Sequence, residues 1–450
     1  MRWYRQILPI VSIVFLLLVA RQIYPYTTPK NNLLIDGFEI EKVASGLGGP
    51  TCLEWASESE LLICDRDGDR ILLMNISDDY SYRTILTGLD NPHGVNFDGN
   101  NLYVSQAGKL SKYDVSHDWQ LNNSTVLIEG FEIEKVASGL GGPTCLEWAS
   151  ESELLICDRD GDRILLMNIS DGHSYRTILT GLDNPHGVNF DGNNLYVSQA
   201  GKLSKYDVSH DWQLNNSTVL IEGIPVGNHQ TNAINELPNG TLIWHSGSTC
   251  NICDEEDQRN GALLWVNGTT GEHGIIASGV RNSFDGVWVD SMGYLFTDNG
   301  RDWEGNHPPE EVNLLIPGEN YGWPDDEPDD PVPAGTIGPV AKWTPHTSVN
   351  GIDVRPDNSP LPGLSSSAGH TVYASVYGSW NTVLPQGHEI IRIDFTPIYD
   401  ETGNFTGWDS EETRIATELG TPLPLRFDSA GNLYYATFGS GGTLNVIRPS

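Results

Sequence analysis

The stretch TCLEWASESELLICDRDGDRILLMNISDGHSYRTIL, residues 144–179, contains the whole pattern of one structural unit. Aliphatic, β-branched and aromatic residues gather in four short runs, at 144–148, 154–157, 163–167 and 175–179. Polar segments separate the runs, and two of these segments carry an Asp-Gly pair, which favours a tight turn between antiparallel strands. The stretch therefore predicts a four-stranded antiparallel sheet in which consecutive strands pair.

This pattern repeats to the end of the chain. A second set of four runs lies at 187–190, 194–197, 203–206 and 219–221, and further sets lie within 233–276, 286–315, 351–415 and 425–447. No amphipathic helix of normal length is evident. Six four-stranded units in series are the layout of a β-propeller. The sequence thus predicts an all-β, six-bladed propeller with antiparallel blades.

One segment of the chain is duplicated. Residues 37–129 recur as residues 130–222 with two differences, Asp79 against Gly172 and Tyr80 against His173. Ancient repeats drift apart, so near-identity indicates a recent duplication or a gene-model artefact. We assign the second copy to the ring, because residues 131–136 can supply the outer strand of the last blade. The expected domains are a duplicated two-blade segment (37–129) and the propeller (130–450); an eight-bladed ring is the alternative.

The first 30 residues have the features of an export signal. Arg2 and Arg5 precede an apolar run at 7–20, which is short for a membrane span of about 20 residues. The pattern predicts a signal peptide, with an uncleaved membrane anchor as the alternative. In either case we expect the protein outside the cell or at its surface.

The charge balance excludes two classes of partner. The chain has 60 acidic and 25 basic residues, for a net charge of −35. Nucleic acid requires a basic face, and anionic lipid attracts basic segments. We therefore expect neither as a partner. Such charge promotes solubility, and it is also typical of proteins from saline environments, where salt screens the repulsion.

Six cysteines suit an exported chain with disulfide bonds. Cys145 and Cys157 lie on two runs predicted to pair as antiparallel strands, so they can face each other. Cys250 and Cys253 form a C-x-x-C pair without a second half-site. We interpret this pair as a local disulfide or as free thiols, with a zinc half-site as the third alternative.

A long segment without strand periodicity carries the most distinctive residues. It contains DNGRD at 298–302, PPEEVN at 308–313 and GENYGWP at 318–324. Loops of this length in a compact domain are usually functional. Carboxylates and main-chain carbonyls are the ligands that Ca²⁺ prefers, so the segment predicts calcium binding.

Two upstream blocks complete a recognisable order, GNHQTN at 227–232 and SGVRN at 278–282. With the loop, they resemble the glucose/sorbosone dehydrogenase family of pyrroloquinoline quinone (PQQ) enzymes. In that family a His, G-[LV]-R-N, N-G-R-D, P-P-x-E-[LIV]-N and N-Y-G-W-P follow one another in this order. The resemblance extends from about residue 130 to the C-terminus and implies a six-bladed propeller that oxidises sugars.

The resemblance also implies roles for the residues that contact substrate and cofactor. His229 matches the family's general base, and histidine is suited to taking a hydroxyl proton. Arg281 and Asn282 match cofactor contacts, where a guanidinium suits a planar, anionic quinone. Asn299 matches a polar cofactor contact, and His346 is a further candidate.

Calcium ligands follow from the same resemblance. The carbonyls of Gly300 and Arg301 match ligands of a Ca²⁺ ion beside the quinone. Glu311, together with the carbonyl of Tyr321, matches a second, structural calcium site. The resemblance therefore implies two metal positions along one loop.

Two positions depart from the family pattern. Thr382 and Thr421 stand where the family usually has arginines. PQQ carries three carboxylates, and their burial without cations is costly. Arg301, Arg355 and Arg426 are candidate replacements.

Two functions remain in view. The first is a secreted, calcium-dependent quinoprotein that oxidises an aldose or sugar aldehyde and gives the electrons to an external acceptor. The second is a non-catalytic, calcium-binding propeller that binds carbohydrate or a protein partner. The threonines favour the second function, whereas His229, Arg281 and the calcium loop favour the first.

Overall fold

The structure, a computed structural model, describes residues 41–302, 305–379, 386–439 and 441–449. These residues contain eight four-stranded antiparallel sheets and, as helix, only two short 3-10 turns, η1 (Arg66–Gly68) and η2 (His117–Trp119). The prediction of an all-β chain is confirmed. The expected signal or anchor at 1–30 lies outside the described residues, and no helix within them is long and apolar enough to cross a membrane.

The chain divides into two compact units, Met1–Gly130 and Phe131–Ser450. The first unit holds two of the sheets. One comprises β1 (Pro50–Trp55), β2 (Glu60–Asp65), β3 (Arg70–Asn75) and β4 (Ser81–Thr87). The other comprises β5 (Gly94–Phe97), β6 (Asn101–Gln106), β7 (Lys109–Val115) and β8 (Leu121–Glu129).

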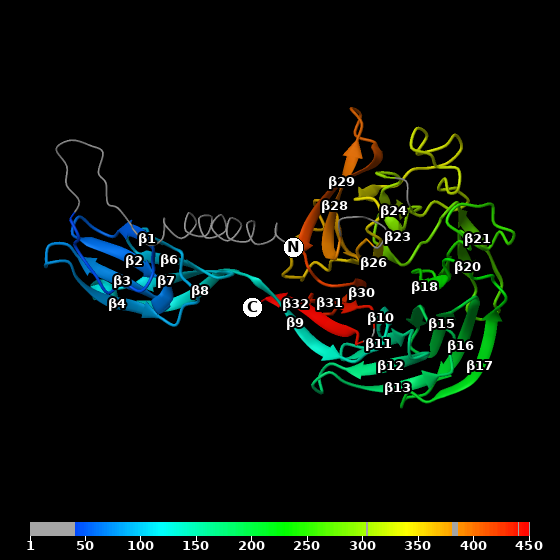
Figure 1. Cartoon of the computed structure of the whole chain (residues 1–450), viewed down its shortest axis with the longest axis horizontal. Helices are drawn as coiled ribbons and strands as arrows, with labels where there is room; N and C mark the ends of the chain where they lie inside the picture. The colour runs from blue at the N-terminus through cyan, green and yellow to red at the C-terminus, as the bar shows by residue number, and fades with distance from the viewer. Residues whose placement is uncertain (1–40, 303–304, 380–385, 440, 450) are drawn as a thin grey trace, which may run out of the picture. The chain divides into compact units, whose positions relative to one another are not determined.

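The second unit holds six sheets (Figure 1). The first three are β10 (Pro143–Trp148), β11 (Glu153–Asp158), β12 (Arg163–Asn168) and β13 (Ser174–Thr180); β14 (Gly187–Phe190), β15 (Asn194–Gln199), β16 (Lys202–Val208) and β17 (Leu214–Ile221); and β18 (Thr231–Glu236), β19 (Leu242–Ser246), β20 (Ala262–Val266) and β21 (His273–Ser278). The next two are β22 (Gly286–Val289), β23 (Gly293–Asp298), β24 (Glu310–Leu314) and β25 (Ala341–Trp343); and β26 (Val349–Val354), β27 (His370–Val376), β28 (Glu389–Tyr399) and β29 (Phe405–Ala416). The last is β30 (Pro422–Phe427), β31 (Leu433–Thr437) and β32 (Thr443–Pro449), completed by β9 (Phe131–Ser138).

The first strands of these six sheets contact one another in chain order, and β30 contacts β10. An apolar core cluster lies between each pair of neighbouring sheets, and one of these clusters lies between the last sheet and the first. The strand β9 pairs with β32 along its whole length, as the sequence predicted, and Figure 1 shows the two side by side. The arrangement is a β-propeller whose last sheet joins strands from both ends of this unit.

The turn between β11 and β12 shows why the predicted hairpins form. The buried Asp158 carboxylate accepts the N–H groups of Gly142 (3.1 Å) and Gly161 (3.0 Å) and binds Arg163 (2.7 Å). These bonds use backbone donors that the turn leaves unpaired, so one aspartate holds the Asp-Gly turn closed. Cys145 and Cys157 are opposite each other on β10 and β11 and form a disulfide, as expected.

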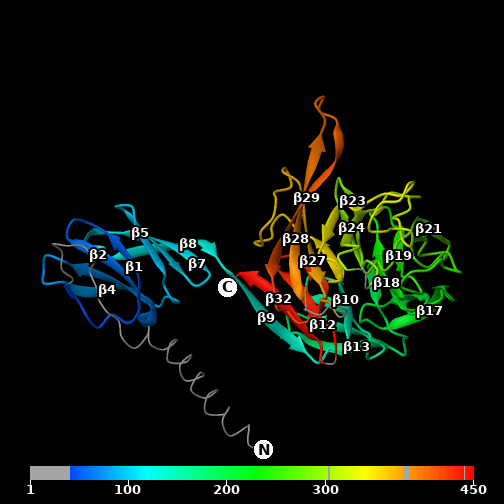
Figure 2. The same cartoon turned by 45° about the horizontal axis from the view of Figure 1, so that its top comes forward.

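The range predicted for the fourth sheet of this unit was too short. Residues 286–315 hold only three of its strands, and the fourth, β25, follows only at residue 341. The segment at 298–324, which we expected to lack strands, contains β24 at 310–314. The three residues of β25 are too few to give a recognisable pattern. Another feature without a sequence signal is the length of the hairpin β28–β29, which extends beyond its sheet in both views (Figures 1 and 2).

The duplicated copies have the same strands but different surroundings. Leu53 in β1 is 65% exposed, whereas its identical counterpart Leu146 in β10 is 2% exposed. Leu146 packs in a cluster with Tyr434 and Leu444 of the last sheet. Burial of this face therefore depends on a neighbouring sheet and not on the strand's own sequence.

Candidate functional site

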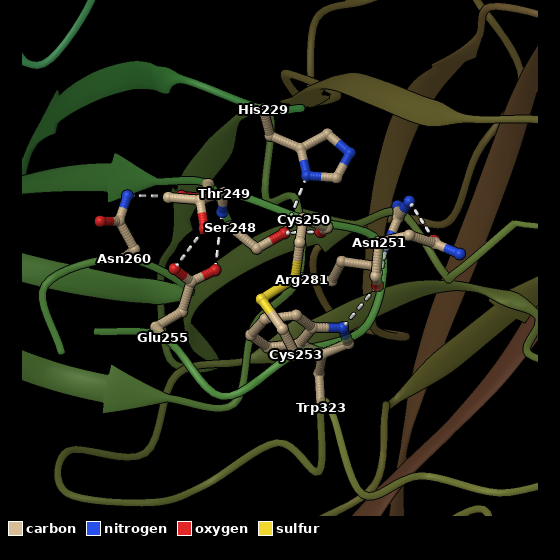
Figure 3. The surroundings of a disulfide bond; sticks show 11 residues. His229, Ser248, Thr249, Cys250, Asn251, Cys253, Glu255, Asn260, Arg281 and Trp323 are labelled. Atoms are coloured by element: carbon tan, nitrogen blue, oxygen red, sulfur yellow. Dashed lines mark hydrogen bonds between the residues drawn. A yellow bond between two sulfur atoms is a disulfide. The ribbon is translucent and has the colours of Figure 1, made fainter. Parts of the chain in front are cut away.

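His229 lies in the loop between β17 and β18 and borders two adjoining cavities. Its Nδ1 is 2.8 Å from the Ser248 hydroxyl, which donates its own proton to the carbonyl of Cys250 at 2.8 Å. The hydroxyl must then accept a proton from Nδ1, so the lone pair of the imidazole is on Nε2. Figure 3 shows this second nitrogen on the side of the ring away from Ser248. Burial, and then the charge of Arg281, lower the His229 pKa to about 3, so the ring is a neutral proton acceptor.

The segment that positions His229 also holds Arg281 (Figure 3). The Asn251 side-chain oxygen accepts bonds from the Arg281 guanidinium (2.8 Å) and from the Asp302 N–H (2.9 Å). The Asn251 carbonyl accepts bonds from Arg281 (3.2 Å) and from the Trp323 indole (3.1 Å). A disulfide joins Cys250 to Cys253 on either side of Asn251. Of the three interpretations of the C-x-x-C pair, the local disulfide is therefore the correct one.

We expect the double substitution Cys250→Ser with Cys253→Ser to lower the free energy of unfolding by about 2 kcal/mol, as for a short closed loop. It should also lower turnover about tenfold, because His229 and Arg281 lose a rigid support. Thermal melts and a dye-linked assay measure the two effects. Cys145→Ser with Cys157→Ser removes a disulfide whose cysteines do not border either cavity, and it should affect stability alone. Equal turnover losses in both double variants would contradict a specific role for the loop.

One cavity, of about 210 Å³, gathers the expected cofactor contacts. Its lining includes His229, Arg281, Asn282, Asn299, Gly300 and His346. Arg281 is 4% exposed and forms an ion pair with Asp302 at 3.1 Å. The Asn299 amide group donates to Asn350 Oδ1 at 3.1 Å. These residues come from loops of different sheets, and the fold brings them around one space.

The same cavity contains an acidic residue that sequence reasoning missed. Glu310 is buried beside Gly300, and burial raises its pKa to about 7. Within the described chain, Glu310 Oε2 and Asn299 Oδ1 have no hydrogen-bond partner. Unsatisfied buried oxygens next to a main-chain turn are the donor set that a hard cation prefers. The residues present therefore fit a Ca²⁺ ion at this position.

A small cavity of about 20 Å³ contains the second expected metal position. Glu311 and Tyr321 line it with Gly300, Arg301, Asp298 and Asp326. Burial, and then repulsion by Asp298, raise the Glu311 pKa to about 8; burial raises the Asp298 pKa to about 7. The Tyr321 hydroxyl bonds to the Leu314 carbonyl at 2.7 Å, so its side chain is directed elsewhere. Clustered carboxylates whose ionisation is unfavourable without a cation fit calcium.

The larger of the two cavities, of about 440 Å³, also borders His229. Polar side chains from the first three sheets line it, including Arg159, Asn184, His186 and Gln230. Aromatic rings of Phe284, Tyr377 and Phe438 supply apolar surface. A space with a few polar groups among rings suits a small organic ligand. Sequence reasoning missed Arg159, Asn184 and His186, because they lie outside the motifs that the sequence shows.

The candidate replacements for the missing arginines are engaged elsewhere. Arg301 is 1% exposed and lies 3.6 Å from Asp326. Arg355 donates to the carbonyls of Ser359 and Leu361, and Arg426 forms an ion pair with Asp285 at 2.7 Å. None of the three borders either cavity beside His229. Thr421 donates to the Phe438 carbonyl at 2.6 Å, and Thr382 lies outside the described residues.

Comparison with solved structures shows what this fold resembles. The PQQ domain of a Coprinopsis cinerea pyranose dehydrogenase, in its holo form, has a TM-score of 0.57 at 18% identity, covering 71% of this chain and 95% of that one. A calcium structure of the carbohydrate-active enzyme family AA12 from Trichoderma reesei has a TM-score of 0.57 at 17% identity, covering 71% and 96%. The soluble aldose sugar dehydrogenase from Escherichia coli, in its apo form, has a TM-score of 0.55 at 17% identity, covering 71% and 100%. No protein-family model and no curated protein matches the chain.

The protein is therefore a β-propeller with the fold of solved sugar dehydrogenases. The second unit, residues 131–450, is 320 of the 450 residues, or 71% of the chain, and the share that these structures cover is also 71%. The resemblance expected from the motifs is confirmed at the level of the fold. A fold does not define a reaction, which depends on the residues of the site.

Proposed function

We propose that the protein is an exported, calcium-dependent quinoprotein that oxidises an aldose or related sugar aldehyde. The observation that carries the proposal is the placement of His229. A neutral imidazole with its lone pair on Nε2 borders both a polar cavity that suits a cofactor and a larger cavity that suits a sugar. The solved sugar dehydrogenases with this fold support the same reaction class.

Each residue has a separate task in this reaction. His229 takes the proton of the sugar hydroxyl, and Ser248 keeps its ring in the required tautomer. Arg281, held by Asn251 and Asp302, presents a fixed positive charge to the smaller cavity. Bound PQQ with Ca²⁺ would supply the hydride acceptor and its polarisation, and an external acceptor would remove the electrons. Asn299 and Gly300 stand where they can hold that pair.

Titration of the calcium-loaded protein with PQQ, followed by a dye-linked assay on a panel of sugars, tests the proposal. Saturable PQQ binding with sugar-dependent dye reduction is the expected result. Protein that binds Ca²⁺ but neither binds PQQ nor turns over any sugar contradicts it.

One structural observation favours a second function, a calcium-binding propeller that binds carbohydrate or protein without catalysis. The positions of Arg301, Arg355 and Arg426 leave the two absent arginines without the expected replacements. A protein that binds sugars equally with and without PQQ, and reduces no dye, would establish this second function.

We further propose that residues 131–450 form a complete six-bladed ring, with the first copy outside it. Support comes from the contact of β30 with β10 and from the pairing of β9 with β32. An eight-bladed ring would place the first copy's sheets between those partners.

Deletion of residues 37–129 should therefore leave a soluble protein with a cooperative melt. Residues 37–129 alone should fold poorly, because two blades leave sheet faces uncovered. Size-exclusion chromatography and thermal denaturation of the shortened protein and of the isolated segment measure both outcomes. Aggregation of the shortened protein would support the eight-bladed alternative, since opening a closed ring exposes apolar sheet faces.

A further inference from the structure

Arg159 is a cation directed toward the larger cavity, and the sequence motifs gave it no role. It follows β11 in the turn to β12, and it borders the 440 Å³ cavity together with His229. Its Nε donates to Asn184 Oδ1 at 3.1 Å, and its guanidinium lies over the Phe438 ring, 5.4 Å from the centroid. The attraction between the cation and the ring favours this position, and the Asn184 bond uses one of the five N–H donors of the group.

The duplicated copy provides an internal comparison. Arg66 has the same neighbours in sequence, and its guanidinium pairs with the adjacent Asp67 at 2.7 Å. Arg159 has the equivalent Asp160 beside it, but within the described residues it forms no ion pair. In the second unit, Arg159 contacts Asn184 and Phe438 beside the cavity and does not pair with the adjacent aspartate.

The other charged residues around the 440 Å³ cavity are compatible with the binding of an anion. Asp183 is the one carboxylate among the cavity's described lining residues, and its Oδ1 accepts a bond from the Asn184 amide at 2.8 Å. Arg281, in the adjoining cavity, already has Asp302 as its partner. Burial, and then the charge of Arg159, lower the His186 pKa to about 4, so His186 is neutral near pH 7. Arg159 is thus the positive charge that this cavity offers to a ligand.

Arg159 also lies near Thr421, one of the two positions where the family usually has an arginine. Thr421 occupies a family arginine position, and its hydroxyl bonds to the carbonyl of Phe438. Phe438 is the residue over whose ring the Arg159 guanidinium lies. A guanidinium from the first sheet of the ring therefore reaches the neighbourhood from which an arginine at 421 would have extended.

We propose that Arg159 binds a ligand carboxylate that extends into the 440 Å³ cavity. Two sources share this chemistry: a carboxylate of the quinone cofactor, or the carboxylate of an acidic sugar such as a uronate. A planar fork with free donors matches a carboxylate in a way that a neutral sugar hydroxyl does not. The choice of ligands rests on the proposed function, but the charge recognition does not.

Isothermal titration calorimetry on the full-length, calcium-loaded chain tests the proposal. The probes are PQQ, D-glucuronate and its neutral analogue D-glucose, measured against Arg159→Gln, Arg159→Lys and the matched control Arg66→Gln. We expect Arg159→Gln to weaken at least one carboxylate probe about tenfold or more, as loss of a charged hydrogen bond does. Arg159→Lys should recover part of the loss, glucose should be unaffected, and Arg66→Gln should match the unaltered chain.

The pattern of losses identifies the source of the carboxylate. Weaker PQQ binding alone assigns Arg159 to the cofactor, and weaker glucuronate binding alone assigns it to an acidic substrate. Glucuronate binding that depends on Arg159, in a protein that does not bind PQQ, keeps this proposal and overturns the quinoprotein function. Unchanged affinities in Arg159→Gln, or an unaltered chain that binds neither carboxylate probe, overturn it. Should Arg159→Gln fold poorly, Arg159→Lys alone decides, because it retains charge but loses the planar fork.

Discussion

Replacement of His229 by alanine is expected to lower turnover by a factor of about 10² to 10⁴, the usual effect of losing a general base. Binding of PQQ should persist, because Arg281, Asn282 and Asn299 remain in the 210 Å³ cavity that we propose for the cofactor. Steady-state kinetics with a dye acceptor, together with PQQ titration, separate the two effects. His210→Ala, which changes an exposed histidine outside the cavities, is the control. Turnover near that of the unaltered protein would remove His229 from the mechanism.

The pH dependence of turnover provides a second measurement on this residue. The His229 pKa is lowered from 6.5 to about 3, so its basic form persists when the pH falls from 7 to 5. An ordinary histidine would lose its base form in that interval. The free energy of unfolding depends on pH in the same direction. The contribution of His229 to it is fully present above pH 6.5 and is lost as the pH falls toward 3, because the unfolded chain takes up the proton first. An acid limb near pH 6.5 that disappears in His229→Ala would contradict this environment.

Removal of calcium is expected to have the second large effect. A ligand that binds only the folded state at about 100 times its Kd stabilises it by about 2.7 kcal/mol, and two positions along the loop fit Ca²⁺. Chelation should therefore lower Tm by several degrees, and added Ca²⁺ should restore it. Glu311→Ala should remove part of this response, because Glu311 and Asp298 border the smaller metal position.

Differential scanning calorimetry of both forms, with and without chelator, measures the effect. Asp329→Ala is the matched control, because it removes an exposed carboxylate from the segment between β24 and β25 that lines neither position. A Tm that responds to neither chelator nor Ca²⁺ would show that the loop is not a calcium site. An equal loss of response in Asp329→Ala would indicate general charge effects instead of a specific ligand.

Much of the site could be predicted because its residues occur in ordered motifs. His229, Arg281, Asn282, Asn299, Gly300 and His346, scattered over more than a hundred positions, line one cavity. Glu310 was missed although it adjoins Glu311, because alternate strand residues face opposite sides and the sequence does not say which side is the site. Ser248 and Asn251 were missed because their roles depend on partners in other loops.

The strand pattern, the Asp-Gly turns and the paired cysteines are local properties, so the sequence alone determined the sheets and the Cys145–Cys157 bond. The duplicated copies show where local information ends. Leu53 is exposed and Leu146 is buried, and Arg66 pairs with its neighbour while Arg159 extends to Asn184 and Phe438. Each pair has the same sequence around it. Burial and charge pairing depend on which distant strands lie within a few ångströms, and that is a property of the folded ring.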